Sequence, residues 1–390
     1  MSIWTDCPGS VELNDLTEFL MRVQVPRTPA LVVRRSALEA NLRSMQAACD
    51  LAGVALRPHG KMAKCSRLAL RQLELGAVGV CCQTVGEAEA FAEAGVGDLL
   101  LSAPIPAWGW PVLKALADRG VSVSAVVDSA AQVAMAPANV ALLVDIDGGQ
   151  HRSGVCFENV PALVRAIVEA GKRWAGLQCY LGQLQADPGR APAHAAVMER
   201  LRVLRDQLRA EGLEPGCITG GGTGTAPLDL AAGVFTEIQA GSYALMDVAY
   251  EGAGAGYARA LLLAASVVSA QRKSHMTIDA GFKALSTDGA LPRLLAGAPE
   301  GSPFFFQGDE HGGLIHPSAV EAMKAHGLAG IDMLEADPTV PQPDWPREGS
   351  LVWLQPGHVD PTVNLHDALW VADEDGTLER WAIDARRVTA

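Results

Sequence analysis

The sequence predicts an α/β fold in which a TIM-like (β/α)₈ barrel is followed by a C-terminal antiparallel β domain. Over residues 28–260, short β-rich apolar runs alternate with helical patterns, as in parallel βαβ units. This stretch holds eight or nine such runs, more than the roughly five or six strands of a usual doubly wound sheet. Beyond residue 260, Gly, Pro and Asp separate the runs instead of helices, which indicates antiparallel strands.

Each apolar run of the first stretch fits one strand, because a barrel strand is buried on both faces and reads as a continuous hydrophobic segment. The expected strands are residues 29–33, 54–59, 77–83, 98–104, 121–128, 140–147, 174–180, 217–222 and 235–243. Helical periodicity predicts helices at 36–52, 66–75, 85–94, 111–119, 161–170 and 192–210. Ser36 is the expected N-cap of the first helix, since its hydroxyl suits that position.

The second stretch predicts strands at 261–270, 275–281, 303–307, 350–357, 368–373 and 378–384. Residues 316–347 interrupt them with a helical piece at 317–327 and a Pro-rich loop at 337–346. We interpret this segment as an insertion or lid.

Composition excludes several classes of function. The 31 basic and 44 acidic residues give a net charge of −13, which disfavours binding to nucleic acid or to an anionic membrane surface. No apolar run approaches the roughly 20 residues of a spanning helix, and the first ten residues lack a secretion signal. Eight cysteines without a C-x-x-C pair predict reduced, mostly buried thiols and a cytoplasmic protein.

Arg57 to Lys61 (RPHGK) follow the second run and so lie at the barrel mouth, where barrel enzymes carry their active sites. Burial there would disfavour the ammonium form of Lys61 and leave a nucleophilic amine suited to a Schiff base. A solvated loop lysine is the alternative.

Two glycine-containing segments predict an anion site. Gly220 to Thr225 (GGGTGT) let backbone N–H groups converge on an anion, and the threonine hydroxyls add donors. The spacing matches neither a P-loop nor a dinucleotide fingerprint. Gly241 to Tyr243 end the next strand and would complete a phosphate cup, or both segments are structural turns.

Two polar clusters have open interpretations. Asp145, Asp147, His151 and Arg152 either position a polar ring substituent or form a salt-bridged rim. His358 and Asp360 are two residues apart, so in an extended segment both would face one divalent ion. An H-x-D pair is also common as a structural element. Further ligands from the same domain would be Asp309, Glu310 and His311, with Asn364, His366 and Asp367 beyond the pair.

Taken together, these motifs resemble the fold-type III, pyridoxal-phosphate-dependent family of D-threonine aldolase and D-serine dehydratase. The matching stretches run in family order over residues 28–384: TPALVV, RPHGKMAK, GAVGVCCQTVGEAEAFAEAG, VDID, HRSGV, GLQCY, ITGGGTGT, FTEIQAGSYALMD, IDAGFKALSTD, DEHG and PGHVDPTVNLHD. The resemblance implies an alanine-racemase N-terminal type of barrel over 28–260. It also implies a β domain made of 1–27 and 261–390 that carries a metal site, and a homodimer.

The family's residues carry over to matching positions. Lys61 would bind the cofactor covalently, with His59 and Tyr180 as further catalytic residues and Tyr180 near the pyridine nitrogen. Gln83 and Arg152 match cofactor-ring contacts. The phosphate cup would consist of Gly221, Gly222, Thr223, Gly241 and Ser242, with Tyr243 beside it. His358 and Asp360 match the ligands of a divalent metal, Mn²⁺, Mg²⁺ or Zn²⁺.

Two positions depart from the family pattern. Ala63 stands where the family often has the second histidine of H-x-K-x-H-K, and Ala186 where Y-x-G-x-x-Q-H ends. The latter histidine is the base that aldolases place near the metal. His59, His194 or a metal-bound water would have to take its role, and losing a positioned base costs about 10²–10⁴-fold in rate.

The resemblance implies a metal-assisted aldolase that cleaves D-β-hydroxy-α-amino acids of the D-threonine, D-phenylserine or β-hydroxyaspartate type into glycine and an aldehyde. One alternative is a D-serine or 3-hydroxyaspartate dehydratase or an amino-acid epimerase, in which Lys61 would remove the Cα proton. Another, from a different class, is a non-catalytic protein that buffers pyridoxal phosphate.

Overall fold

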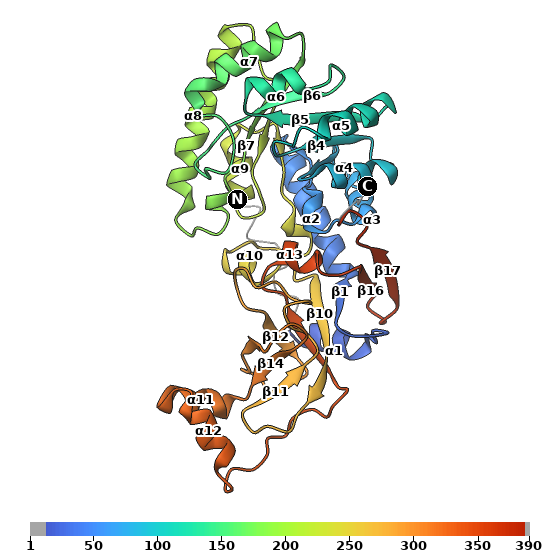
Figure 1. Cartoon of the computed structure of the whole chain (residues 1–390), viewed down its shortest axis with the longest axis vertical. Helices are drawn as coiled ribbons and strands as arrows, with labels where there is room; N and C mark the ends of the chain where they lie inside the picture. Colours follow the sequence, from blue (N-terminus) through green and yellow to red (C-terminus); the bar gives the residue numbers. More distant parts are fainter. Residues whose placement is uncertain (1–12, 387–390) are drawn as a thin grey trace.

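The computed structural model describes residues 13–386 and shows a barrel joined end to end with a β domain (Figure 1). Eight parallel strands form the barrel sheet in the order β2-β9-β8-β7-β6-β5-β4-β3. They are β2 (Ala55–Leu56), β3 (Val80–Cys82), β4 (Asp98–Leu101), β5 (Ser122–Val127), β6 (Ala141–Asp145), β7 (Arg173–Cys179), β8 (Cys217–Gly220) and β9 (Glu237–Ile238). A parallel bridge between His59 and Cys81 joins the two edge strands. The predicted (β/α)₈ architecture is confirmed.

Helices lie outside the barrel sheet. They are α2 (Arg35–Ala52), α3 (Ser66–Glu74), α4 (Val85–Glu93), α5 (Gly109–Asp118), α6 (Ala130–Met135), α7 (Val160–Glu169), α8 (Arg190–Ala210) and α9 (Ala226–Ala232). The sequence did not predict the short α6 and α9. Ser36 is not the N-cap of α2, because the helix begins one residue earlier and the Ser36 hydroxyl donates to Glu374 instead.

The second sheet has nine strands. They are β1 (Ala30–Arg34), β10 (Leu261–Ser269), β11 (His275–Ile278), β12 (Arg293–Ala296), β13 (Phe304–Phe306), β14 (Gly312–Ile315), β15 (Leu351–Gln355), β16 (Ala368–Ala372) and β17 (Leu378–Ala382). Strands β12 and β14 were not predicted. Helix α1 (Leu13–Arg22) packs on this sheet, where Phe19 joins a buried cluster with Val32 and Leu262.

Strand β1 lies in the second sheet although its sequence opens the alternating stretch. It pairs antiparallel with β10 and parallel with β16. The fully buried pattern of Ala30–Arg34 suits either sheet equally, so periodicity alone could not place it. The predicted barrel segment, residues 28–260, thus includes β1 although β1 is not a barrel strand. The parallel pairing of β1 with β16 also makes the second sheet mixed rather than purely antiparallel.

The insertion at 316–347 forms a helical hairpin of α11 (Pro317–His326) and α12 (Ala329–Ala336), of which only the first helix was predicted. The hairpin lies at the end of the β domain farthest from the barrel (Figure 1). It therefore does not act as a lid over the barrel mouth of its own chain.

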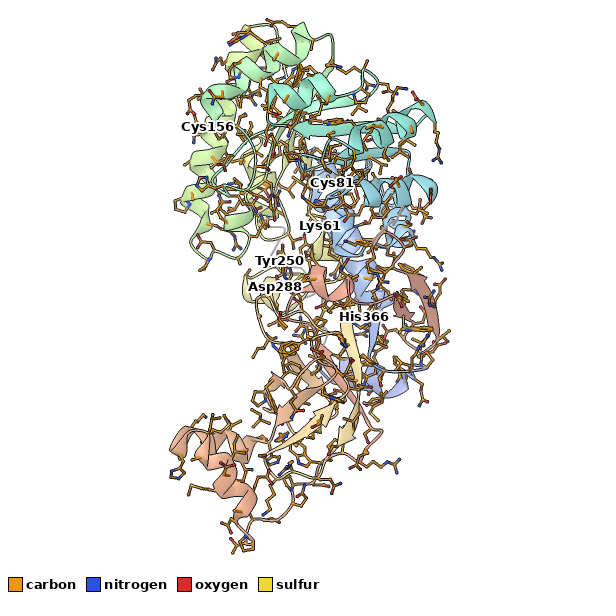
Figure 2. The ribbon with its side chains drawn as sticks, in the orientation of Figure 1. Lys61, Cys81, Cys156, Tyr250, Asp288 and His366 are labelled. Carbon is orange, nitrogen blue, oxygen red and sulfur yellow. The ribbon has the colours of Figure 1, made fainter. Side chains whose placement is uncertain are left out.

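Two further features concern the class of protein. Five of the seven described cysteines are buried, among them Cys81 inside the barrel, whereas Cys156 is exposed (Figure 2). Within residues 13–386, every helix is too short or too polar to cross a lipid bilayer.

Candidate active site

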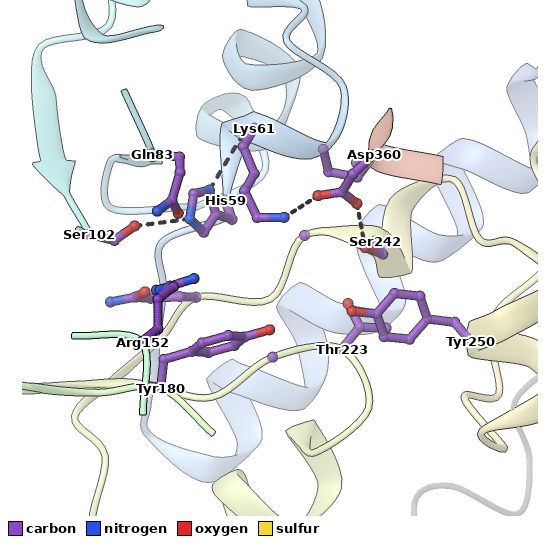
Figure 3. A pocket seen from close by; sticks show the side chains of 14 residues that line it. His59, Lys61, Gln83, Ser102, Arg152, Tyr180, Thr223, Ser242, Tyr250 and Asp360 are labelled. Carbon is purple, nitrogen blue, oxygen red and sulfur yellow. Dashed lines mark hydrogen bonds and ion pairs between the residues drawn. The ribbon is translucent and has the colours of Figure 1, made fainter. Parts of the chain in front are cut away.

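A pocket opens at the carboxyl ends of the barrel strands, next to the β domain (Figure 3). It encloses about 470 Å³ of free space including its mouth. The barrel supplies all but one of its lining residues, and the β domain supplies Asp360. The lining residues are His59, Lys61, Met62, Gln83, Ser102, Arg152, Tyr180, Gly222, Thr223, Gln239, Gly241, Ser242, Tyr250 and Asp360.

Lys61 lies on a short 3₁₀ turn, Gly60–Met62, directly after β2. Its ammonium forms an ion pair with the Asp360 carboxylate, and Figure 3 shows the two side chains pointing toward each other. Burial alone would lower the pKa of Lys61, but the Asp360 charge outweighs it and the pKa lies above its ordinary value. The sequence prediction of a lysine neutralised by desolvation is thus wrong, because it did not include the Asp360 carboxylate.

The hydrogen bonds of His59 assign its tautomer. Its Nδ1 accepts the backbone N–H of Lys61 at 3.4 Å, so any proton of the neutral ring lies on Nε2. That nitrogen is 2.9 Å from Ser102 Oγ, which in turn donates to the Cys82 carbonyl. Burial and the Lys61 charge lower the pKa of His59 to about 3. With both nitrogens engaged, His59 is not free to act as a base.

The anion-binding wall comes from the ends of β8 and β9. Gly222, Thr223, Gly241 and Ser242 line the pocket, and Thr223 Oγ1 accepts the Tyr243 N–H at 2.9 Å, which joins the two halves. The backbone N–H groups of Thr223 and Ser242 have no hydrogen-bond partner within residues 13–386.

Two of the predicted cup residues lie behind this wall. Gly221 has a φ of +69°, and a Cβ there would meet the Asp229 carboxylate at 2.4 Å, so the site requires glycine for the backbone and not for a ligand. Tyr243 is fully buried and its hydroxyl accepts from Gln72 at 2.9 Å. It is a structural neighbour of the cup.

His194 also lies behind the cup. It is 3% exposed, and its Nε2 is 2.7 Å from Asp229 Oδ1, while Asp229 Oδ2 accepts from Thr225. His194 thus ties α8 to α9 and does not line the pocket. The suggestion that it replaces the missing base is wrong for this geometry.

The opposite wall carries Arg152 and Tyr180, with the guanidinium 5.8 Å from the ring centroid (Figure 3). Of the predicted polar cluster around Arg152, only Arg152 itself lines the pocket. Asp147 lies 2.7 Å from His151 Nδ1 on the rim, so these two side chains bind each other and do not line the pocket.

A hydrogen-bonded polar layer forms the pocket floor. Gln239 donates to Gln178 at 3.0 Å, and Gln178 donates to Asp145 at 3.0 Å. Beneath it the barrel interior is an apolar cluster of Cys81, Leu100, Val126 and Leu143. Because buried amides and carboxylates are costly unless paired, this closed network holds the floor in one arrangement.

The expected metal pair has a different backbone from the one predicted. His358 is extended, but Asp360 lies in the first turn of helix α13 (Val359–Val363), so they are not i and i+2 of one strand. His358 Nε2 is nevertheless 4.0 Å from Asp360 Oδ2, and His358 Nδ1 is 3.0 Å from Asp288. Within residues 13–386, His, Cys, Asp and Glu side chains form no group of three suited to a metal.

The other suggested ligands lie elsewhere. The pocket lining does not include Asp309, Glu310, His311, His366 or Asp367. Asn364 lines a second cavity that adjoins the pocket on its outer side. Glu310 pairs with Lys283, and Asp367 with Arg386. Of the suggested metal ligands, only His358 and Asp360 therefore lie close together. A cation bound by these two would need water or substrate oxygens to complete its coordination.

Asp247 couples the cofactor side of the site to the β domain. It is fully buried, and one carboxylate oxygen accepts the Tyr250 N–H at 2.7 Å while the other accepts the Val359 N–H at 2.8 Å. It caps helix α10 (Val248–Gly252), which carries Tyr250, and holds the start of α13, which carries Asp360. Together with backbone hydrogen bonds from Val248 to Pro356 and from Ala249 to Gly357, this carboxylate fixes the relative positions of the two pocket residues.

Four lining residues were not predicted, among them Met62, which neighbours Lys61. Ser102 and Gln239 follow β4 and β9, so the rule that selects strand ends would have found them. Tyr250 had no such signal. The two departures from the family pattern lie outside the pocket wall, since Ala63 is buried behind it and Ala186 is exposed to solvent.

The pocket residues fit pyridoxal phosphate. The free N–H groups and hydroxyls of the cup suit a phosphate dianion, and Lys61 supplies an amine for the carbonyl group. Arg152, Tyr180, Gln83 and His59 provide walls of the size and polarity of an aromatic ring with polar substituents.

Comparisons with known proteins agree with this geometry. Residues 33–248 match the family "Alanine racemase, N-terminal domain", and residues 260–372 match "Putative serine dehydratase domain". The chain is 37% identical over 380 residues to D-threonine aldolase from Arthrobacter sp, covering 92% of both chains. It is 33% identical over 386 residues to 3-hydroxy-D-aspartate aldolase from Paracoccus denitrificans, again covering 92% of both. The crystal structure of D-threonine aldolase from Filomicrobium marinum superposes with a TM-score of 0.82 at 32% identity, covering 92% of this chain and 95% of that one.

Proposed function

The chain belongs to the alanine-racemase-like family of pyridoxal-phosphate-dependent lyases, and from that premise we propose that it cleaves D-β-hydroxy-α-amino acids into glycine and an aldehyde. The observation that carries the proposal is the contact between Lys61 and Asp360. It joins a carbonyl-reactive amine of the barrel to a carboxylate of the β domain, with His358 beside it. An aldolase needs these two functions next to each other, one at the amino acid's nitrogen and one at its β-oxygen.

When bound, pyridoxal phosphate supplies an electron sink for the bond that breaks at Cα. The cup around Thr223 and Ser242 would hold its phosphate, Lys61 would bind its carbonyl carbon, and Arg152 and Tyr180 would contact its ring. Burial raises the pKa of Tyr180 and of Tyr250, so both phenols stay protonated and donate hydrogen bonds.

The β-hydroxyl proton needs an acceptor in this pocket. His59 is engaged at both nitrogens, and the two tyrosines are donors. Asp360 is the carboxylate that lines the pocket within residues 13–386, and beside the Lys61 ammonium its pKa lies below its ordinary value despite burial. We assign to Asp360 the hydrogen bond that accepts from the hydroxyl and orients it.

We further propose that His358 and Asp360 hold a divalent cation, with Mn²⁺, Mg²⁺ or Zn²⁺ as the candidates. Imidazole and carboxylate suit such ions, and the 4.0 Å separation of the two side chains allows both to approach one centre. The cation would act as a Lewis acid on the β-oxygen. The experiment is aldehyde release from D- and L-β-hydroxy amino acids with added Mn²⁺, with and without chelator. Chelator-sensitive aldehyde release from D substrates supports the proposal. Release that does not depend on added metal or chelator would contradict the proposed role of the cation.

A second candidate is β-elimination, in which hydroxide leaves and a 2-oxo acid forms. It is favoured by the serine dehydratase match of the β domain and by the missing histidine at position 186, since elimination does not require the β-hydroxyl proton to be removed. Epimerisation at Cα would need the same Lys61 and no cleavage. The products distinguish all three.

The assembly and compartment are also proposals. We propose a homodimer in the cytoplasm, since the described cysteines carry free thiols and the family resemblance implies two subunits. A mass near twice 40.9 kDa in solution supports the dimer, and a single-chain mass refutes it.

A further inference from the structure

A second cavity adjoins the inner pocket and opens outward from it. It holds about 1540 Å³ of free space including its mouth, so it is wider than the inner pocket. Lys61, Gln83 and Asp360 line both cavities, so the outer one begins where the amine and the β-oxygen of a substrate would lie. Figure 2 shows Asp288, another residue of the outer cavity, close to this junction of the two domains.

One wall of the outer cavity is apolar. The loop between β4 and α5 begins at Ser102 in the inner pocket and continues outward through Pro104, Ile105 and Pro106 to Trp108. Trp108 is 64% exposed, in contrast to Trp110, which is buried. An exposed indole in a cavity wall offers a large, rigid apolar surface to a ligand.

The cations of the outer cavity are all neutralised by partners within residues 13–386. Lys61 pairs with Asp360, and Lys64 lies 3.0 Å from Asn364 Oδ1 and 3.5 Å from Glu87. Arg386 pairs with Asp367 at 2.5 Å. The wall also contains the carboxylate of Asp288. This carboxylate pairs with His358 at 3.0 Å, so a second carboxylate on the substrate would find no unpaired cation and would be buried at a cost in desolvation.

We propose that the outer cavity is the subsite for the substrate side chain, and that it takes apolar and aromatic groups and rejects acidic ones. The inference rests on the proposed function for the placement of the substrate's nitrogen and β-oxygen. Trp108 is the specificity-determining residue, and aromatic β-hydroxy amino acids are the preferred class over β-hydroxyaspartate.

The test measures binding separately from cleavage. Holoenzyme is titrated calorimetrically with D-phenylalanine, D-alanine and D-aspartate, which lack a β-hydroxyl and cannot release an aldehyde. We expect D-phenylalanine to bind tightest and D-aspartate weakest. Trp108→Ala weakens D-phenylalanine binding about tenfold, because it removes the aromatic contact, and leaves D-alanine within about twofold. Trp108→Phe restores most of the affinity.

Two variants sharpen the test. Trp108→Arg places an unpaired cation in the wall, and we expect it to raise D-aspartate affinity while lowering that for D-phenylalanine. Leu328→Ala, an equally exposed apolar residue on the distant hairpin, leaves all three affinities unchanged. Equal effects of Trp108→Ala on the three ligands, or none, overturn the subsite.

The same variants are assayed for aldehyde release from D-phenylserine, D-threonine and D-3-hydroxyaspartate. Selective loss of the aromatic substrate in Trp108→Ala supports the subsite. If no substrate yields an aldehyde while D-phenylalanine binding still depends on Trp108, the proposed aldol reaction fails and the subsite stands. If aldehydes form but Trp108→Ala slows all substrates alike, the aldol reaction stands and the subsite fails.

Discussion

The barrel wall of the inner pocket and the junction that faces the β domain are built in different ways. On the barrel side, Asp145, Gln178 and Gln239 form one hydrogen-bonded layer on an apolar core. On the junction side, Asp360 depends on an ion pair with Lys61 and on the buried Asp247. The residues that we propose to hold the cofactor thus lie mostly at strand ends, whereas those that we propose to meet the substrate lie on loops and short helices between the domains.

The barrel wall of the inner pocket does not depend on the two residues that depart from the family pattern, Ala63 and Ala186. Ala63 is buried behind the wall and Ala186 faces solvent, so neither interrupts the cup or the floor. Both alanines therefore leave the lining of the inner pocket unchanged.

The largest effect is expected from Lys61→Ala, which removes the one group that belongs to both regions. Activity should fall at least about 10³-fold, because the amine that binds the carbonyl is lost. Aldehyde release and the visible absorbance of bound cofactor measure it. Lys64→Ala, three residues away, is the matched control and should keep the cofactor spectrum. Normal activity in Lys61→Ala would contradict the assignment.

Asp360→Asn tests the junction alone. We expect a loss of about 10²–10⁴-fold in aldehyde release and no response to Mn²⁺, since the carboxylate both orients the hydroxyl and is a proposed ligand. Cofactor absorbance should stay, because Asp360 touches the cup only by accepting from the Ser242 hydroxyl at 3.3 Å, and asparagine keeps an oxygen acceptor there. Asp288→Asn, which changes the neighbour of His358, should cost less than about tenfold. If Asp360→Asn lost cofactor absorbance as much as aldehyde release, the barrel wall and the junction would not act as separate regions.

Asp247→Ala tests whether the junction depends on one buried carboxylate. The variant leaves the N–H groups of Tyr250 and Val359 unpaired, and stability should fall by about 2–3 kcal/mol. Thermal unfolding measures this loss. At temperatures where the variant is folded, Mn²⁺ affinity should weaken more than cofactor affinity, and Asp247→Asn should have a smaller effect. Equal weakening of both affinities would indicate a general rather than a local defect.

The smallest effect is expected at Glu251, where α10 meets the β domain. It accepts from Arg259 at 2.8 Å and from Arg293 and Gln355 at 2.9 Å. Burial alone would raise its pKa, but these partners lower it to about 2. Because the folded pKa is depressed, its contribution is present above about pH 4.5 and is lost as the pH falls toward 2.

Glu251→Gln should therefore cost about 1 kcal/mol or less at pH 7, and the difference from the parent should shrink at pH 4 and pH 3. Urea unfolding midpoints at the three pH values measure it. A difference that grows on acidification would contradict the sign of the pKa shift.

Much of the barrel could be predicted from the sequence because its signals are local. Each buried run ends at the mouth, so Lys61 and Arg152 were found as residues that follow strands, whereas Gln83 and Tyr180 were predicted only from the family resemblance. The same rule would have found Ser102 and Gln239. Strand β1 was placed in the wrong sheet because a short buried strand has the same pattern in either one.

The junction could not be predicted in the same way. Tyr250 enters the pocket because Asp247 binds Val359, a contact across 112 residues that leaves no local pattern. The helical turn at Asp360 and the neutralised charges of Lys64 and Arg386 are likewise set by tertiary partners. The motif could show that His358 and Asp360 belong together but not what they face.

The most direct test of the account is the product formed from D-threonine, followed by proton nuclear magnetic resonance with pyridoxal phosphate and Mn²⁺ present. We predict glycine and acetaldehyde in equal amounts. 2-Oxobutanoate would show that Lys61 and Asp360 serve β-elimination, and a second threonine diastereomer would show epimerisation. Either product in place of glycine would contradict the assignment of this pocket to carbon–carbon cleavage.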